Sequence, residues 1–354
     1  MSPSPSMALR ALAASTLLVL SVTCLWLMDI TTLVQKYPTP GSSGAITWPG
    51  GAIPILQNFH GVRLLDEVFR DVTVGFAPFS LGYDALSWWG VLTFLQDFGV
   101  VYLVLLCESA RGVNRWTVAY FPGVFGLLGQ LIPAGVMFPF FYFLCVLFCP
   151  PAPSARDRAA RKIALGDAWV FLPAVVGFHT LPVLGMFFAA SYEDRHYWTW
   201  FWQLYPVRVF FAYVVVKGGA KMLALRRRGL DVSYQKSVTL LVAPMIAVSA
   251  ATWIYVLSSS PYSLRERAWP AAVAEETFAM RMRRILQCDA LFMFAGTFAW
   301  LGYLLGEMWS ARLIDAKQVA GFVAVGIASL GAVGPGATVG VLWLWREAFL
   351  VGDR

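Results

Sequence analysis

The chain has 354 residues, of which 58% are apolar and only 13% are charged, and it carries a net charge of +7. This composition excludes an ordinary soluble domain, in which about 25% of the residues are charged. It is typical of a membrane protein, because lipid replaces water around most of the surface of such a protein.

Eight apolar stretches come close to the ~20 residues that a helix needs to cross the hydrocarbon layer. They are 8–28, 85–107, 119–148, 167–190, 198–216, 237–257, 286–308 and 318–345. Only helices and closed barrels satisfy their backbone groups in lipid, and the alternation typical of barrel strands is absent. The sequence therefore predicts an all-α, polytopic helical membrane bundle of about eight transmembrane helices. We expect it to form a single domain over residues 1–354.

The first apolar stretch is long for the core of a signal peptide. Only one basic residue, Arg10, lies near its start, and no small-x-small pattern precedes Asp29, so we expect an uncleaved first helix. Residues 29–62 are rich in Gly, Pro and Ser and predict an ordered loop or a lid over one mouth of the bundle. Residues 63–84 mix apolar and acidic side chains, which indicates a short interfacial helix.

Arg and Lys gather in two of the loops between the apolar stretches, which is a signal of membrane orientation. One loop holds Arg156, Arg158, Arg161 and Lys162, and the other holds Lys217, Lys221, Arg226, Arg227, Arg228 and Lys236. With eight spans, both loops lie opposite the termini, and the positive-inside rule then predicts lumenal termini. Five arginines between residues 258 and 285 favour the opposite orientation. We interpret the basic runs as orientation signals and expect no nucleic-acid partner.

No motif for a nucleotide, a metal or a redox cofactor occurs, since the CxxC, GxGxxG, Walker, HExxH and GxSxG patterns are all missing from the sequence. The five cysteines lie within or at the ends of apolar stretches. Cys145 and Cys149 are too few for a metal site without a nearby His. The sequence therefore predicts a protein with no cofactor and no metal site.

The second apolar stretch carries two carboxylates, and each is a candidate for function because a carboxylate is costly in a lipid-embedded helix. Asp97 and Glu108 are eleven residues apart and project from nearly one helix face, but they lie about 16 Å apart along the axis. Each therefore needs a partner on another helix. Arg111 lies three residues after Glu108 and can pair with it. Glu108 is then either a catalytic acid or half of an ion pair that ends the helix.

The seventh apolar stretch offers a second acid with aromatic neighbours. Asp289 lies near one end of the stretch, and Phe292 and Trp300 fall on roughly the same helix face. Glu307, on this face as well, is interpreted as an interfacial residue. This arrangement presents an acid at one interface and aromatic rings toward the middle of the membrane. The alternative for Asp289 is an ion pair with Arg284 at the level of the headgroups.

Two more polar side chains lie inside apolar stretches. His179 is deep in the fourth stretch, where a lone His is either a substrate-binding group or a hydrogen-bonding partner for another helix. Arg208 is inside the fifth, and a buried Arg needs a carboxylate or an anionic ligand. Trp202 belongs to a Trp and Tyr cluster just before Arg208. That cluster is either an interfacial aromatic belt or a wall that stabilises a cationic intermediate.

Acids in an aromatic-rich cavity within the lipid suit one reaction in particular, the protonation of a lipophilic polyene or epoxide followed by cyclisation. The acid has to be protonated near neutral pH, and burial in a low dielectric favours that form of a carboxyl group. The cationic intermediates then need aromatic walls and the exclusion of water.

Several short runs of the sequence resemble a group of fungal integral-membrane proteins. They are Leu64-Leu65-Asp66 through Phe69 to Phe79, Glu108-Ser109 with Arg111 and Asn114, the stretch from Gln130 to Pro139, and Leu286-Gln287-Cys288-Asp289 followed by Trp300. The group is similar to the membrane-bound terpene cyclases of ascofuranone-type meroterpenoid pathways. The resemblance implies a substrate that is a prenylated aromatic compound with a terminal epoxide. It also implies buried acidic residues that open the epoxide and start the cyclisation.

The sequence thus predicts a membrane-bound terpene cyclase of secondary metabolism, an isomerase-type enzyme of the endoplasmic reticulum. The predicted catalytic residues are Asp289, Glu108 and Asp97, and the predicted substrate-binding residues are His179, Trp202, Arg208, Phe292, Trp300, Arg111 and Asn114. The expected partners are a lipophilic prenylated small molecule, membrane lipids and other enzymes of the pathway.

Two alternatives remain open at this point. One is a different lipid-modifying or isomerising membrane enzyme. The other is a transporter, channel or ligand-binding protein for a lipophilic molecule, since prolines and charges inside membrane helices suit a transporter as well. A cavity that opens to lipid favours an enzyme, and a polar path across the bilayer favours a transporter.

Overall fold

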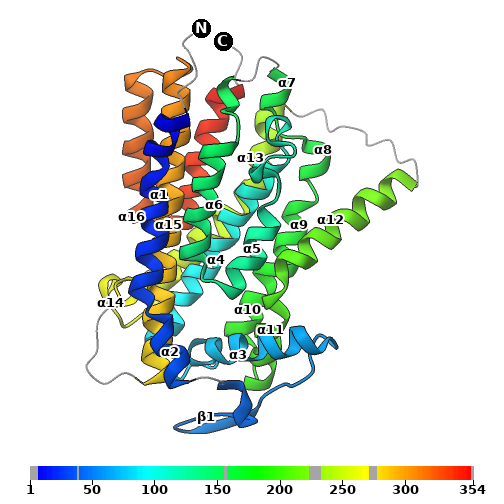
Figure 1. Cartoon of the computed structure of the whole chain (residues 1–354), viewed down its shortest axis with the longest axis vertical. Coiled ribbons are helices and arrows are strands. Elements are labelled where there is room, and N and C mark those ends of the chain that lie inside the picture. The colour runs from blue at the N-terminus through cyan, green and yellow to red at the C-terminus, as the bar shows by residue number, and fades with distance from the viewer. Residues whose placement is uncertain (1–6, 38–39, 155–157, 223–232, 271–276, 352–354) are drawn as a thin grey trace.

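A computed structural model of the chain describes residues 7–37, 40–154, 158–222, 233–270 and 277–351. Helices make up most of the described chain (Figure 1), which confirms the predicted all-α polytopic bundle. Six helical segments among the described residues are long and apolar enough to cross a membrane. Some residues of the basic runs lie outside the described residues; these are Arg156, Arg226, Arg227 and Arg228.

The elements divide into long helices, shorter helices that interrupt the expected spans, and small elements at the ends of the bundle. The long helices are α1 (Met7–Met28), α4 (Ala85–Ser109), α12 (Tyr205–Met222), α13 (Tyr234–Ser259), α15 (Phe278–Ser310) and α16 (Ala316–Val351). The shorter ones are α5 (Pro122–Leu131), α6 (Ala134–Phe148), α9 (Phe171–Val175), the π-helical turn η5 (Val176–Thr180), α10 (Leu181–Phe188) and α11 (Tyr192–Gln203). The small elements are α2 (Ile30–Lys36), η1 (Pro40–Ser43), β1 (Ala45–Trp48), β2 (Gly51–Pro54), α3 (Arg63–Ser80), η2 (Gly112–Asn114), η3 (Val118–Tyr120), η4 (Ala152–Ser154), α7 (Arg158–Arg161), α8 (Leu165–Ala168) and α14 (Leu264–Ala268).

The expected loop at 29–62 holds a short β-hairpin at one end of the bundle (Figure 1). β1 and β2 pair antiparallel, with Ile46 opposite Ile53. Both isoleucines are buried in a small apolar cluster with Val74 of α3. The helix expected over residues 63–84 is therefore present as α3, and it also anchors the hairpin.

The expected third span, 119–148, is wrong as a single helix, because it folds into two antiparallel helices. Ile132 is extended and Pro133 follows it, so the hydrogen-bond ladder stops there. The rings of Phe125 and Phe141 then pack with centroids 4.6 Å apart. The outer ends of the two helices are also in contact, since Cys149 Sγ lies 3.3 Å from Thr117 Oγ1. The chain therefore enters and leaves at the same end of the bundle, as a re-entrant hairpin of α5 and α6.

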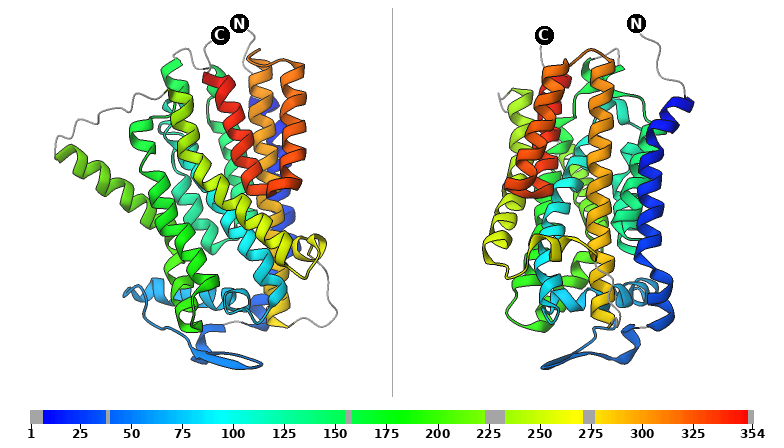
Figure 2. Two further views of the ribbon diagram at one scale, coloured as in Figure 1. Left: turned by 180° about the vertical axis from the view of Figure 1, so that it is seen from behind. Right: turned by 90° about the vertical axis from the view of Figure 1, so that its left-hand side faces the viewer.

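The expected eighth span, 318–345, is also a re-entrant hairpin and not one helix. The backbone of α16 reverses at Gly334, whose φ of 84° and ψ of 171° suit only glycine. Beyond this reversal, Trp345 packs against Phe322 with ring centroids 5.2 Å apart. The first half of α16 thus runs into the bundle and the second half runs back out (Figures 1 and 2).

The expected fifth span, 198–216, is broken as well. α11 ends at Gln203, the backbone of Leu204 is not helical, and α12 then starts with Pro206 in its first turn. α12 leans away from the rest of the bundle (Figure 1). The start of α12 packs against α5 near Gly126, and residues of both helices also line a cavity.

Two parts of the chain repeat one arrangement that is not visible in the sequence. Each part runs down one helix, crosses the far end, runs up a second helix and ends in a re-entrant hairpin (Figure 2). The first part is α1, α4 and the pair α5 and α6; the second is α13, α15 and α16. Their packing is reciprocal, since α1 packs on α6 and α15, and α13 packs on α16 and α4. The segment between the two parts, 158–222, has no counterpart.

The hairpins correct the expected orientation. Each returns the chain to the end from which it came, so α1 starts, α16 ends and α7 lies at one end of the bundle (Figure 1). At this end, Tyr234 of α13 bonds to Ile163 and to Glu347 of α16. The first basic loop, with Arg161 and Lys162, therefore lies at the end of the termini, and the prediction that it lies opposite them is wrong.

The hairpin α5–α6 is tested by labelling from one side of the membrane. In a Cys-free background, Trp116→Cys and Pro150→Cys, both exposed at the outer ends of the hairpin, should react alike with a membrane-impermeant maleimide in sealed microsomes. Ala52→Cys in β2 should show the opposite sidedness. Opposite labelling of the first two positions would restore a single span across 119–148.

Candidate functional site

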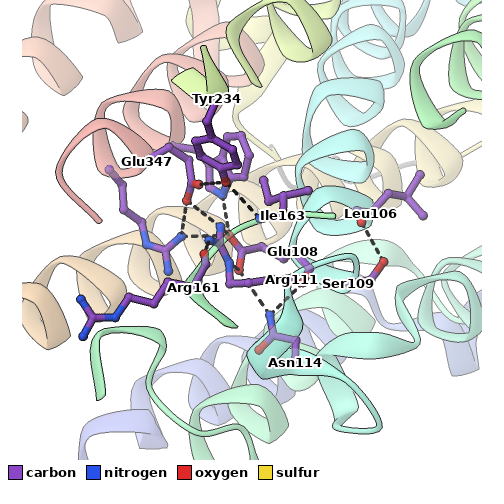
Figure 3. Close-up of polar contacts among 11 residues, drawn as sticks. Leu106, Glu108, Ser109, Arg111, Asn114, Arg161, Ile163, Tyr234 and Glu347 are labelled. Carbon is purple, nitrogen blue, oxygen red and sulfur yellow. Dashed lines mark hydrogen bonds and ion pairs between the residues drawn. The ribbon is translucent and has the colours of Figure 1, made fainter. Parts of the chain in front are cut away.

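An ion-pair cluster lies where α4 ends (Figure 3). Its members are Glu108 and Arg111 at this end, and Arg346 and Glu347 from the returning half of α16. Glu108 Oε1 accepts from Arg111 Nη2 at 2.7 Å and from Arg346 Nη1 at 2.9 Å, and Arg111 Nη2 also donates to Glu347 Oε1 at 2.5 Å. Two guanidinium groups and two carboxylates meet with no net charge.

Neutral groups complete the hydrogen bonds of this cluster. Trp343 Nε1 donates to Glu108 Oε1 at 2.8 Å, Asn114 Nδ2 donates to the Glu108 carbonyl at 2.9 Å, and Tyr234 Oη donates to Glu347 at 3.2 Å. Arg111 also donates to the carbonyl of Arg161. All four charged side chains are buried, and a buried pair is strongly destabilised when one partner is removed. The cluster therefore fastens the ends of the two repeated parts to each other.

Arg346 and Glu347 are functional candidates that the sequence reading missed. The eighth span was expected to stop at residue 345, which left both charges beyond the membrane. Their signal was present, because an adjacent Arg and Glu interrupt the apolar run 339–351. The ion-pair alternative for Glu108 is what the structure shows, with two guanidinium partners where one was expected.

Two cavities flank the last turns of α4. The smaller has a volume of about 40 Å³, enough for ordered water, and brings together Glu108, Asn114 and Trp300, with Glu307 also in its wall. The larger has a volume of about 710 Å³, which is in the range of sites for drug-sized ligands, and Arg111 lies in its wall.

The larger cavity lies between α4, α5, α9 and α12, and most of its wall is apolar. Phe121, Val124 and Phe210 belong to this wall and are themselves exposed on the outside of the bundle. The cavity therefore opens sideways between α5 and α12, where lipid surrounds the protein. An opening of this kind admits a lipophilic molecule directly from the membrane.

A chain of aromatic rings leads inward from the large cavity. Tyr102 lies in the cavity wall and packs edge-on against Tyr205, with ring centroids 5.0 Å apart. Tyr205 in turn meets His179 at 4.9 Å, and Trp202 lies 5.9 Å from His179. The structure thus brings together two predicted substrate-binding residues, His179 and Trp202, next to the cavity but behind its wall.

The polar atoms of this aromatic group have no hydrogen-bond partner among the described residues. They include both ring nitrogens of His179, the indole nitrogen of Trp202 and the hydroxyls of Tyr102 and Tyr205. The π-helical turn η5 carries His179, and such turns are frequent at functional sites. Each buried polar group without a partner costs about 1–3 kcal/mol, so this interior favours a polar guest such as water.

Asp97 and Asp289 cap the tips of the re-entrant hairpins. Asp289 Oδ1 accepts from the Gly135 N–H at 2.5 Å, at the start of α6. Asp97 accepts from the Gly336 N–H, just after the reversal in α16, and from Ser249 Oγ at 2.5 Å. Each carboxylate thus faces the N-terminus of a half-helix, where unpaired N–H groups and the helix dipole favour negative charge.

The remaining predicted residues lie apart from the cavities or bind differently. Asp289 and Phe292 belong to a region packed on α1, away from Glu108. An ion pair of Asp289 with Arg284 was the predicted alternative, but the Asp289 carboxylate binds the Gly135 N–H instead. Arg208 was expected to balance a carboxylate. It lies over the Phe201 ring at 4.0 Å and donates to the Phe201 carbonyl instead.

Comparison with known proteins places the chain in one protein family. The model of the CtvD domain matches residues 10–351, which is nearly the whole chain. The chain is a member of the CtvD-domain family. No solved structure matches it.

Three relatives of this CtvD-domain chain carry the names of enzymes. It is 28% identical over 88% of its length to the FAD-dependent monooxygenase verC1 of Penicillium polonicum. It is 25% identical over 85% of its length to the FAD-dependent monooxygenase anuJ of Penicillium roqueforti. The match covers 39% and 37% of those two proteins, so the chain spans well under half of their length. The terpene cyclase resF of Aspergillus sclerotiorum is 26% identical over 73% of the chain and 72% of resF.

The close contact at the hairpin tips of this CtvD-domain chain predicts that Gly336→Ala is destabilising. A Cβ at Gly336 would lie 2.5 Å from the backbone of Asp97, so the tip would have to move. Overpacking of this kind costs about 1–3 kcal/mol. Gly321→Ala in the first half of α16 is the control, because a Cβ there meets nothing within 4 Å. Thermal unfolding in detergent should give a lower midpoint for Gly336→Ala only; equal midpoints would contradict the capping contact.

Proposed function

We propose that the protein is a membrane-bound terpene cyclase that starts the cyclisation of a prenylated, lipophilic substrate by protonating an epoxide or an alkene. The observation that carries this proposal is the large apolar cavity, which opens toward lipid and has the charged end of α4 in its wall. Its volume of about 710 Å³ accommodates a prenylated aromatic molecule.

The reaction is an isomerisation. The acid donates a proton to the epoxide oxygen, the C–O bond breaks, and a double bond of the prenyl chain attacks the resulting cationic carbon. The new cation then loses a proton, so atoms and charge balance without another reactant. General-acid work of this kind typically contributes about 10²- to 10⁴-fold to the rate.

Asp289 and Asp97 remain ahead of Glu108 as candidates for the acid. Arg111 and Arg346 both donate to the Glu108 carboxylate, and two guanidinium partners favour its charged form, which has no proton to give. The Glu108 side chain also borders the small cavity and not the large one. Asp289 and Asp97 accept from backbone N–H groups at the hairpin tips, and neither has a guanidinium partner among the described residues. The sequence also favoured Asp289, although it could not reveal that α6 begins beside this residue.

Aromatic side chains near the large cavity are suited to the cationic intermediates. Tyr102 belongs to its wall, and Tyr205, His179 and Trp202 continue inward from that ring. Aromatic faces attract positive charge, and a desolvated contact contributes about 2 kcal/mol. Trp300, stacked on Tyr142 at 4.9 Å, has the corresponding place beside the small cavity.

The names of the relatives support this type of chemistry. One relative is named a terpene cyclase, and two longer ones are named FAD-dependent monooxygenases. A monooxygenase inserts the kind of oxygen atom that an acid-initiated cyclase then protonates. The described residues contain no parallel sheet of the kind that holds a dinucleotide, so we assign no flavin to this region. A meroterpenoid pathway in the endoplasmic reticulum is the setting that we propose.

A transporter for a lipophilic molecule is the second candidate, and the re-entrant hairpins favour it. Discontinuous helices near the middle of the membrane form the substrate sites of many transporters. Here, however, the half-helix N-termini face Asp97 and Asp289, which already occupy the positions that an anionic substrate would take. Uptake of a labelled epoxyfarnesyl phenol into proteoliposomes, without chemical change, would favour transport over cyclisation.

The cyclase proposal is tested in microsomes that contain the full chain, with an epoxyfarnesyl phenol as substrate. A cyclised isomer should form, and NMR is needed with mass spectrometry because the mass does not change. Asp289→Asn should lower the yield at least about a hundredfold. Glu108→Gln unbalances the ion-pair cluster, so the amount of folded protein has to be measured beside its activity.

Asp289→Asn and Asp97→Asn are the matched variants, because the amide oxygen still accepts the hydrogen bond of the hairpin tip while the acid is lost. Both should fold normally. A hundredfold loss in folded Asp289→Asn, with Glu108→Gln active, would support the acid role of Asp289, whereas a loss in folded Glu108→Gln alone would assign that role to Glu108. Full activity in all three variants would refute an acid role for these carboxylates.

A further inference from the structure

The wall of the large cavity carries charge of one sign. Arg111, Arg115 and Lys217 lie in this wall, and no Asp or Glu does so among the residues that the structure describes. Arg111 is already engaged by Glu108 and Glu347, whereas Arg115 is exposed and pairs with no carboxylate in the described part of the chain. The cavity is therefore electropositive at the end near the termini and apolar elsewhere.

A buried hydroxyl group lies close to the same part of the cavity. Tyr102 is fully buried, and its Oη has no hydrogen-bond partner among the described residues. A Cβ built on Gly123 would lie 3.7 Å from this oxygen, so the hydroxyl lies beside the first turn of α5. An orphaned donor inside a cavity wall costs free energy unless a guest accepts from it.

The first turn of α5 adds a third favourable element. Phe121 precedes the helix, Pro122 begins it, and both belong to the cavity wall together with Gly123 and Val124. Pro122 has no N–H and the Val124 N–H donates to the Phe121 carbonyl, so this turn contributes mainly the partial positive charge of the helix N-terminus. The hydroxyl of Tyr102, the start of α5 and Arg115 thus act on the same cavity, and we call them the polar corner.

We propose that the polar corner binds the acidic head of an amphiphile, a carboxylate or an ionised phenol, whose apolar tail fills the rest of the cavity. This rests on the proposed function in so far as the amphiphile is the substrate of the cyclase. Tyr102 donates a hydrogen bond to the head, and Arg115 and the start of α5 supply positive charge. The orientation places the acidic head toward the end of the bundle that holds α7, and the tail toward the interior.

An anionic phospholipid has the same chemistry as such a substrate, since it also joins an acidic head to an apolar tail. The two sources differ in how they compete. A substrate-like acid should bind in a bilayer of phosphatidylcholine alone, and phosphatidate added to the bilayer should displace it only if the cavity also accepts the lipid.

The test uses the purified full chain in phosphatidylcholine nanodiscs and a matched pair of probes, 3-farnesyl-4-hydroxybenzoate and its methyl ester. The acid should bind at least about tenfold more tightly than the ester, which lacks the charge. Tyr102→Phe should weaken binding of the acid about tenfold, because a hydrogen bond to a charged group is lost. Arg115→Gln should weaken it about three- to fivefold, as expected for an exposed ion pair. Neither variant should change binding of the ester.

Arg312→Gln is the control, because Arg312 is exposed and is not in the cavity wall. Equal binding of acid and ester, or an equal loss in Arg312→Gln, would overturn the proposal. Displacement by phosphatidate that Tyr102→Phe abolishes would identify the occupant as a lipid at the same polar corner. Binding is read without turnover, so a chain that binds the acid but forms no product would refute the cyclase proposal alone.

Discussion

The fold depends on satisfying helix ends that lie inside the membrane. A re-entrant hairpin leaves N–H groups of its returning helix without intrahelical partners, in surroundings where lipid offers no hydrogen bond. Asp289 and Asp97 supply the acceptors, each from a helix of the other repeated part. Glycine at positions 135 and 336 lets backbone and carboxylate approach, since a Cβ would lie 2.6 Å and 2.5 Å from its neighbour. The exchange of caps makes each hairpin dependent on the other half of the protein.

The ion-pair cluster completes this exchange at the end near the termini. Glu108 and Arg111 come from the first repeated part, and Arg346 and Glu347 come from the second. Capped tips fix the hairpins in the interior, and the cluster fixes them where they emerge. A change on either side of this cluster is therefore expected to affect stability before it affects chemistry, which is why variants of Glu108 need a measurement of folding beside activity.

Composition and apolar periodicity were sufficient to predict a helical membrane bundle, and the carboxylates they singled out are buried as expected. They failed at the hairpins, because an apolar run of about 30 residues has the same composition whether it crosses the membrane once or turns back midway. The turn signals were present as Pro133 and as the Gly334-Pro335-Gly336 run, but a proline also fits a kinked span. The partners of Asp97 and Asp289 come from segments 152 and more residues away, and local pattern carries no information about such contacts.

The two repeated parts, which pack on each other reciprocally, form the scaffold of the protein, and the segment between them forms much of the candidate site. The part of the chain without a counterpart, 158–222, contributes Phe171, Val209 and Tyr213 to the large cavity and carries His179 on its π-helical turn. Its last helix, α12, leans away from the bundle (Figure 1), and residues of α12 line that cavity together with α5. The repeated parts are held together by helix caps at the hairpin tips and by ion pairs at the end near the termini. The segment 158–222 instead contacts α4 through aromatic rings whose polar atoms have no hydrogen-bond partners among the described residues. The repeated parts are thus tightly constrained, whereas the segment between them keeps buried polar groups without partners. This difference is expected of a protein in which a rigid frame supports one adaptable wall of the ligand cavity.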